Sequence, residues 1–86
     1  MEYNKQTKNR LKRIEGQVRG VLKMMEERQE CEKIVIQLSA VASAIHHTVG
    51  VIVSENLKNC LMEQITNGDN TEDLVKDAVK LLVKSR

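Results

Sequence analysis

The stretch between the two cysteines, Cys31 and Cys60, most constrains the fold of this chain. It contains no proline and a single glycine, Gly50, and its aliphatic residues recur at intervals of three, four or seven positions. The recurring residues are Ile34, Leu38, Val41, Ile45 and Ile52. This periodicity is typical of an amphipathic α-helix. The sequence therefore predicts one long helix that carries a cysteine near each end.

The spacing of the cysteines limits how their thiols can meet. Cys60 follows Cys31 by 29 residues, which is about 20° beyond a whole number of helical turns, so both lie on nearly one face. Along the axis they stand about 43 Å apart at roughly 1.5 Å per residue, so the thiols of one straight helix cannot meet. If two such helices pack antiparallel, Cys31 of one subunit lies near Cys60 of the other, and this pairing is our hypothesis. The alternative is a kink near Gly50, although nothing else there indicates a turn.

The composition favours a small domain that needs a partner. With 86 residues and Tyr3 as its only aromatic residue, the chain is expected to form one domain, residues 1–86, with a core of aliphatic side chains. Such a chain buries little surface alone, so a homo-oligomer is the expected state.

Two further helices are predicted beside the long one, which gives an all-α fold with three helices per chain. A first helix over 5–27 places aliphatic residues in a coiled-coil-like 3-4-3-4 seam. The seam consists of Leu11, Ile14, Val18, Val21 and Met25, and Gly16 and Gly20 lie together on another side, where a second backbone can approach. The polar run 26–30 predicts a turn, although neither glycine nor proline marks it.

The second helix is expected over 31–65, and the segment 66–70, Thr-Asn-Gly-Asp-Asn, predicts a loop. A third helix follows, with Asp69, Asn70 or Thr71 as its cap. Its inner stripe is formed by Leu74, Ala78, Leu81 and Leu82.

The cysteines and the hydropathy pattern bear on location and chemistry. We expect no apolar run of membrane-spanning length and no signal peptide, and therefore a cytoplasmic protein. Two cysteines in a reducing compartment favour metal binding or redox chemistry over a permanent disulfide. The alternative, which the residues alone leave open, is that both are small buried core residues.

The first helix carries most of the positive charge. Between Lys5 and Lys23 there are seven basic residues and one acidic residue, Glu15. On a helical wheel Lys5, Lys8, Lys12, Arg19 and Lys23 fall within about 60°, opposite the aliphatic seam, and Arg10 and Arg13 flank that seam. A solvated face is the plain interpretation, but a cationic strip nearly free of acids, repeated in an oligomer, favours contact with DNA phosphates. Without aromatic residues for stacking on single strands, duplex DNA is the expected partner.

Several of these residues match a known family. The segment Arg10-Leu-Lys-Arg-Ile-Glu-Gly-Gln-Val-Arg-Gly20, followed by Met24, Met25, Cys31 and a second cysteine late in the next helix, resembles the CsoR/RcnR family of bacterial repressors. The resemblance covers essentially the whole chain. It implies an antiparallel helical-bundle dimer that assembles into a flat tetramer, binds operator DNA through a basic face and releases it when an inducer arrives. On that face we expect Lys8, Arg10, Lys12, Arg13, Arg19 and His47.

Departures from the family pattern indicate which inducer the chain senses. Copper(I) sensors of the family follow the first cysteine with a His-x-x-x-Cys pair, whereas this chain has Asn56-Leu-Lys-Asn-Cys60, and an amide is a poor copper(I) ligand. The only histidines, His46 and His47, lie about 20 Å along the helix from either cysteine. Nickel and cobalt sensors need an N-terminal histidine, and formaldehyde sensors a proline after the initiator methionine, where this chain has Glu2.

Two cysteines without the histidine resemble the persulfide-sensing, CstR-type branch of the family. This resemblance implies that Cys31 attacks the sulfane sulfur of a persulfide or polysulfide, and that Cys60 of the facing subunit resolves the adduct into a di-, tri- or tetrasulfide bridge. The expected inducer is thus a reactive sulfur species, with no cofactor and no metal. The alternatives are a copper(I)-responsive repressor or a helical interaction module that does not bind DNA. An enzyme is not expected, because no acid/base pair and no phosphate loop is present.

Overall fold

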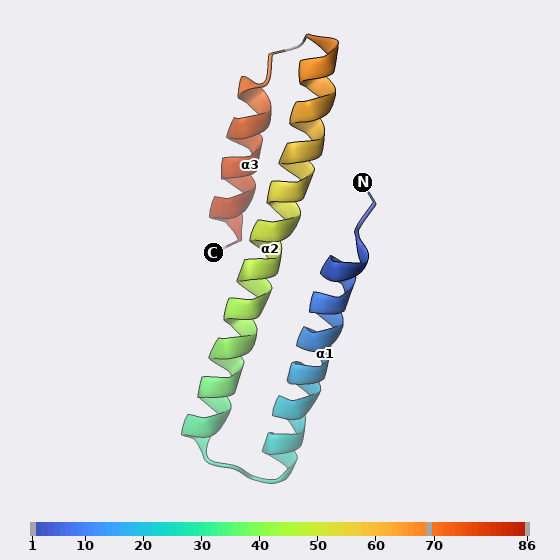
Figure 1. The fold of residues 1–86 in the computed structure, drawn as a ribbon. Helices are drawn as coiled ribbons and strands as arrows, with labels where there is room; N and C mark the ends of the chain where they lie inside the picture. Colours follow the sequence, from blue (N-terminus) through green and yellow to red (C-terminus); the bar gives the residue numbers. More distant parts are fainter. Residues whose placement is uncertain (1, 69, 86) are drawn as a thin grey trace. The chain divides into compact units, whose positions relative to one another are not determined.

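The computed structural model describes residues 2–68 and 70–85. Within these residues it contains three α-helices and no strand: α1, Lys5–Glu26; α2, Cys31–Asn67; and α3, Glu72–Lys84 (Figure 1). The predicted all-α fold with three helices is confirmed. The predicted ends are close to the observed ones, because periodic apolar spacing and polar turns mark helix limits well.

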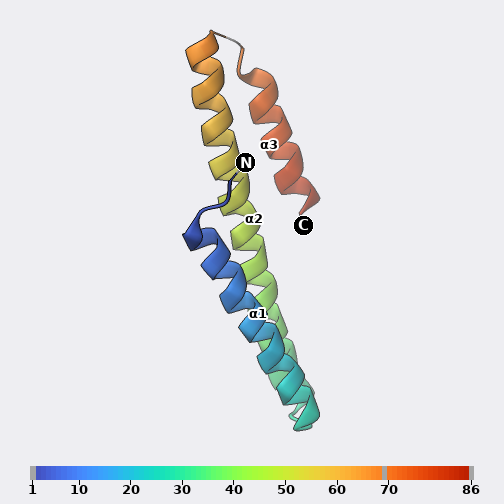
Figure 2. The ribbon, with the colours of Figure 1, turned by 90° about the vertical axis from the view of Figure 1, so that its right-hand side faces the viewer.

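The chain forms two compact units, Glu2–Thr48 and Val49–Arg86, and the boundary between them falls inside α2. In the first unit α1 runs antiparallel to the first part of α2 (Figures 1 and 2). In the second unit α3 runs antiparallel to the last part of α2. Each unit is therefore a helical hairpin, and α2, which continues as one helix across Gly50, contributes to both.

Local hydrogen bonds mark both ends of α1. At the start the Asn4 side chain accepts a hydrogen bond from the backbone N–H of Thr7 at 2.8 Å, which satisfies one of the free amides of the first turn. At the end Gln29 N donates to Met24 O at 3.0 Å and Arg28 N donates to Met25 O at 3.1 Å. This pair of bonds is a Schellman motif, which places Arg28 in the left-handed region with φ 56°.

Arg28→Gly is expected to stabilise the protein by about 1 kcal/mol. A side chain in the left-handed region costs about 1–2 kcal/mol, and glycine avoids that cost while losing some chain entropy on folding. The check is chemical unfolding of the reduced protein at one fixed protein concentration. Glu27→Gly is the matched control, because φ at Glu27 is −79° and glycine there is expected to destabilise. A lower stability of Arg28→Gly contradicts the assigned strain.

The predicted loop between α2 and α3 is also confirmed. Gly68 adopts φ 76° directly after α2, the conformation for which glycine is preferred. Of the three candidate caps for α3, Asn70 supplies the side-chain acceptor: its Oδ1 accepts from Glu72 N at 2.9 Å. Thr71 makes no side-chain capping bond, and Asp69 lies outside the described residues.

Only part of the predicted α1 seam is buried within the chain. The buried residues of α1 are Thr7, Ile14 and Val21, spaced by seven, and Val41 and Thr48 of α2 are buried in the same unit. The other members of the seam, Leu11, Val18 and Met25, remain 40–47% exposed. Among the described residues no large side chain is fully buried. The hairpin of the first unit therefore leaves a second apolar face of α1 without a partner inside that unit.

The expectation that no apolar run approaches the length of a membrane span is wrong. By length and composition alone, α2 is a helix that could cross a membrane, and only 11% of its most apolar window is buried within the chain. The reason is that no Asp, Glu, Lys or Arg occurs between Ile34 and Ser54. The same pattern is found in the central helix of a packed bundle, where apolar residues surround the helix on most sides.

Candidate functional site

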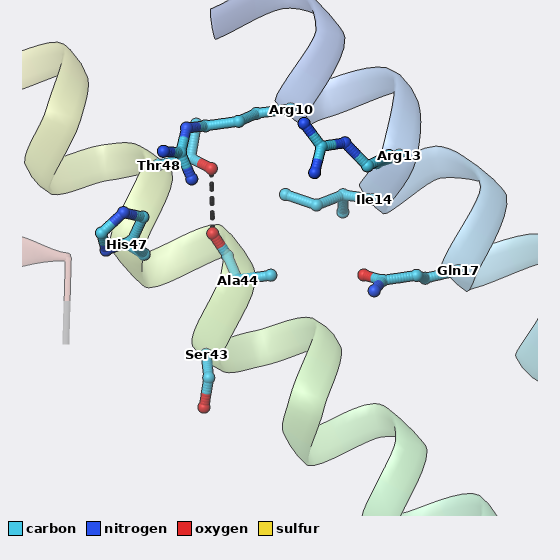
Figure 3. A pocket seen from close by; sticks show the side chains of 8 residues that line it. All are labelled: Arg10, Arg13, Ile14, Gln17, Ser43, Ala44, His47 and Thr48. Atoms are coloured by element: carbon cyan, nitrogen blue, oxygen red, sulfur yellow. Dashed lines mark hydrogen bonds between the residues drawn. The ribbon is translucent and has the colours of Figure 1, made fainter.

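A hollow of about 320 Å³ in the first unit gathers basic and polar side chains from both of its helices (Figure 3). It is lined by Arg10, Arg13, Ile14 and Gln17 of α1 and by Ser43, Ala44, His47 and Thr48 of α2. Three of the residues predicted to contact DNA, Arg10, Arg13 and His47, thus lie together although they come from different helices. We call this space the arginine hollow.

The helical period explains how this lining forms. Arg10, Arg13 and Gln17 are spaced by three and four, so they project from one flank of α1 next to the buried line that includes Ile14. On α2, Thr48 is buried and its hydroxyl donates to Ala44 O at 2.9 Å. Figure 3 shows the Arg10 side chain reaching across from α1 toward Thr48 and His47 of α2. Packing along Ile14 and Thr48 therefore positions the polar groups.

The charge of the arginine hollow is one-sided. No carboxylate lines it. Among the described residues an ion pair joins Lys76 to Glu72, at 3.4 Å on α3, and neither guanidinium takes part in it. Two cations that face one hollow without an internal counter-ion produce a positive potential that attracts anions.

The other predicted DNA contacts lie elsewhere on α1. Lys8, Lys12 and Arg19 do not line the hollow. At 3.6 residues per turn their mean direction is about 150° from that of the Arg10–Gln17 flank. Arg19 folds back over its own helix, with Nη2 4.0 Å from the position of a Cβ on Gly16. The six predicted residues therefore form two groups, the arginine hollow and a separate exposed strip.

Cys31 occupies the position predicted for it, as the first residue of α2. It is a free, exposed cysteine, so a reagent in solution can reach its sulfur. It directly precedes Glu32, the acidic residue of the first turn. Amide groups at a helix start favour a negative sulfur atom, whereas a neighbouring carboxylate opposes it.

Cys60 lies in a different setting, in the second unit. It is half-buried and faces a hollow of about 260 Å³ between α2 and α3. The lining residues are Val53, Asn56, Leu57, Cys60, Leu74, Asp77, Ala78 and Leu81. Aliphatic side chains dominate, and Asp77 is the only charged residue among them. This thiol is therefore less accessible than that of Cys31.

The residue one turn before Cys60 contacts its sulfur. Cys60 Sγ donates a long, weak hydrogen bond of 3.9 Å to Asn56 Oδ1. Asn56 stands where the copper(I) pattern places a histidine, so an amide and not an imidazole faces the thiol. Within the described part of a single chain, no group of three or more His, Cys, Asp or Glu residues is arranged to hold a metal ion.

Sequence reasoning missed the polar companions of both hollows. Gln17 follows Arg10 by seven and Arg13 by four, a helical spacing that places it on their flank and could have identified it. No comparable spacing links Asp77 to Cys60, because the two residues belong to different helices. Their proximity depends on how α3 packs on α2.

Comparisons with known proteins agree with this arrangement of helices. The model of the family described as metal-sensitive transcriptional repressor matches residues 3–84. The chain is 37% identical over 82 residues to the copper-sensing transcriptional repressor CsoR of Bacillus subtilis (strain 168), covering 93% of this chain and 81% of that protein. It is 49% identical over 63 residues to the uncharacterized protein YrkD of the same organism, covering 73% of this chain and all of YrkD.

A solved structure shows the same fold. The nickel-responsive transcriptional regulator InrS superposes with a TM-score of 0.80 at 29% identity, over 99% of this chain and 94% of that one. The family model spans nearly the whole chain, and CsoR exceeds 30% identity over most of its own length. The chain therefore belongs to the metal-sensitive transcriptional repressors, the CsoR/RcnR family, whose members regulate transcription on DNA and are not enzymes.

Proposed function

We propose that this chain is the CstR-type member that the sequence indicates: a repressor that binds operator DNA in its reduced state and releases it on reaction with a persulfide or polysulfide. The observation that carries the proposal is Asn56 beside Cys60, at 3.9 Å, in place of a metal-binding histidine. The sensing residues are Cys31 and Cys60, and no cofactor is required.

The DNA contact is assigned first to the arginine hollow. Arg10, Arg13 and His47 line it together with Gln17 and without a carboxylate, and guanidinium groups bind phosphate oxygens in a bidentate geometry. Lys8, Lys12 and Arg19 form the second, exposed group, which contributes mainly long-range attraction for the duplex.

The sensing reaction follows from the two cysteine settings. The exposed Cys31 thiolate attacks the sulfane sulfur of a persulfide R–S–SH, the thiolate R–S⁻ leaves, and Cys31 becomes a persulfide. The Cys60 thiolate of the facing subunit then attacks the Cys31 sulfur and expels HS⁻, which leaves a disulfide. A second donor molecule can first convert Cys60 to a persulfide. The outer sulfur of the Cys31 persulfide then attacks the Cys60 sulfur and displaces HS⁻, which leaves a trisulfide.

Assembly connects this reaction to DNA. The exposed apolar residues of α1 and the stretch 34–54 of α2, which contains no Asp, Glu, Lys or Arg, support a homo-oligomer. We propose the family's flat tetramer of antiparallel dimers, with residues 1–86 acting as one functional domain in the cytoplasm. A bridge between two α2 helices fixes their relative position and can disfavour the shape that fits DNA. A hundredfold loss of operator affinity needs only about 2.7 kcal/mol of coupling.

A copper(I)-responsive repressor is the second candidate, because the relative CsoR is named copper-sensing. The two thiolates and a third, unidentified ligand would then hold the ion.

One titration separates the two candidates. Reduced protein is bound to a duplex that it selects from random sequences, and the affinity is measured again after a persulfide donor, hydrogen peroxide or copper(I), with the intact mass of each product. We expect the persulfide donor to release DNA and to produce a cross-linked dimer, joined either by a disulfide or by a trisulfide that retains one added sulfur atom. Release by one copper(I) ion per chain, with no response to the persulfide, supports the copper candidate instead.

A further inference from the structure

The arginine hollow has a property that a basic surface for DNA does not require. Arg10 and Arg13 face the same 320 Å³ space as the Gln17 amide and the His47 ring, whereas DNA attraction alone needs only exposed charge. The Lys8, Lys12 and Arg19 strip on the other side of α1 already supplies exposed charge of that kind. A hollow lined by nitrogen donors from both helices can hold one bound group, in addition to attracting a diffuse layer of counter-ions.

The donors indicate the chemistry of that group. The Thr48 hydroxyl proton is engaged by Ala44 O at 2.9 Å, and Ser43 points away from the two arginines in Figure 3. The groups free to donate into the hollow are therefore two guanidiniums, one amide and one imidazole, all nitrogen donors. Donors from two helices and two directions suit an anion with several oxygens that point different ways, and planar guanidiniums each take two of them.

The size of the hollow agrees with a small anion. One water molecule occupies about 30 Å³ of liquid, so a space of 320 Å³ holds a tetrahedral oxyanion with part of its hydration shell. Ile14 and Ala44 form an apolar part of the lining.

We propose that this hollow is a discrete seat for one tetrahedral oxyanion. In the operator complex a single backbone phosphate fills this seat. This part of the proposal rests on the DNA binding proposed above. In the free protein, inorganic phosphate or sulfate fills the same seat, independently of any DNA contact. Free oxyanion and operator DNA therefore compete for the hollow. The oxyanion lowers the operator affinity by more than chloride does at the same ionic strength.

The test uses reduced full-length protein and nitrogen NMR of arginine and glutamine side chains. Inorganic phosphate, and separately sulfate, replaces chloride at constant ionic strength and pH. We expect saturable shifts of the Arg10, Arg13 and Gln17 signals in the wild type. Gln17→Glu, nearly isosteric, places a carboxylate in the seat and is expected to weaken binding by about tenfold or more.

Matched controls separate a seat from general charge. Gln37→Glu makes the same change at an exposed position of α2 in the same unit and is expected to bind as the wild type does. Arg13→Lys keeps the charge but removes the planar fork and is expected to weaken binding, whereas Lys33→Ala removes a charge elsewhere on α2 and is expected to have no effect. Equal weakening by Gln17→Glu and Gln37→Glu, or shifts that never saturate, overturns the proposal.

Measurements of operator binding show whether a free oxyanion and a DNA backbone phosphate occupy the same hollow. With the selected duplex, sulfate is expected to lower the affinity more than chloride at the same ionic strength, and Arg13→Lys is expected to reduce that difference. Saturable oxyanion binding without competition overturns the phosphate contact but leaves the seat established. Arginine-dependent DNA binding with no oxyanion binding overturns the seat and leaves the proposed DNA contact in place.

Discussion

Replacing Cys31 with serine is expected to leave operator binding within about twofold of the wild type and to abolish release by a persulfide donor. Cys31 is the exposed thiol at the start of α2, and a hydroxyl in its place cannot attack sulfane sulfur at neutral pH, because the reacting species is a thiolate. The wild type is expected to lose about a hundredfold in affinity, which corresponds to about 2.7 kcal/mol of coupling. The measurement is operator affinity before and after the donor.

Cys60→Ser is the matched partner of this variant. It retains the proposed attacking thiol, so its intact mass is expected to show sulfur added to Cys31 but no cross-linked dimer. A cross-link in Cys31→Ser, or normal release of DNA by that variant, contradicts the roles assigned to the two cysteines. Because Cys31 is exposed, its replacement is expected to change the free energy of unfolding by less than about 0.5 kcal/mol.

Arg10→Ala and Arg13→Ala are each expected to weaken operator binding by about ten- to a hundredfold. A charged hydrogen bond contributes about 1.5–3 kcal/mol, and each guanidinium faces the hollow without an internal carboxylate. The slope of log affinity against log salt is also expected to become shallower by about one for each phosphate that the variant no longer neutralises. The measurement is a set of binding isotherms at several salt concentrations.

Lys12→Ala is the control for position on the helix. It removes the same charge from α1 but on the side about 150° away, so its effect on operator affinity is expected to be several times smaller. Equal losses for Lys12→Ala and Arg13→Ala mean that the duplex contacts the strip as much as the hollow. Wild-type affinity of both arginine variants at moderate salt removes the hollow from the DNA interface.

The sequence alone was sufficient for the secondary structure, because local rules govern it. Apolar spacing predicted α1, α2 and α3, and the polar runs at 26–30 and 66–70 predicted both turns. It was not sufficient for the details of the turns. The left-handed Arg28 has no local mark, since glycine is the usual residue there, and Asn70 was one of three possible caps for α3.

In the candidate sites, too, some features could be predicted from the sequence and others depend on tertiary packing. The sequence by itself determined that both cysteines belong to one long helix and that Arg10 and Arg13 flank an aliphatic seam, because the helical period fixes directions within one helix. That Asn56 stands in place of a histidine before Cys60 followed from the resemblance to the copper(I) sensors of the family. Only the tertiary structure decided that His47, which the family resemblance placed on the basic face, lines the same hollow as those arginines. It also decided that Gln17 completes this hollow and that Asp77 lines the hollow of Cys60. These pairings depend on the register between two helices, which is set by how buried side chains such as Ile14 and Thr48 interlock and not by any local pattern.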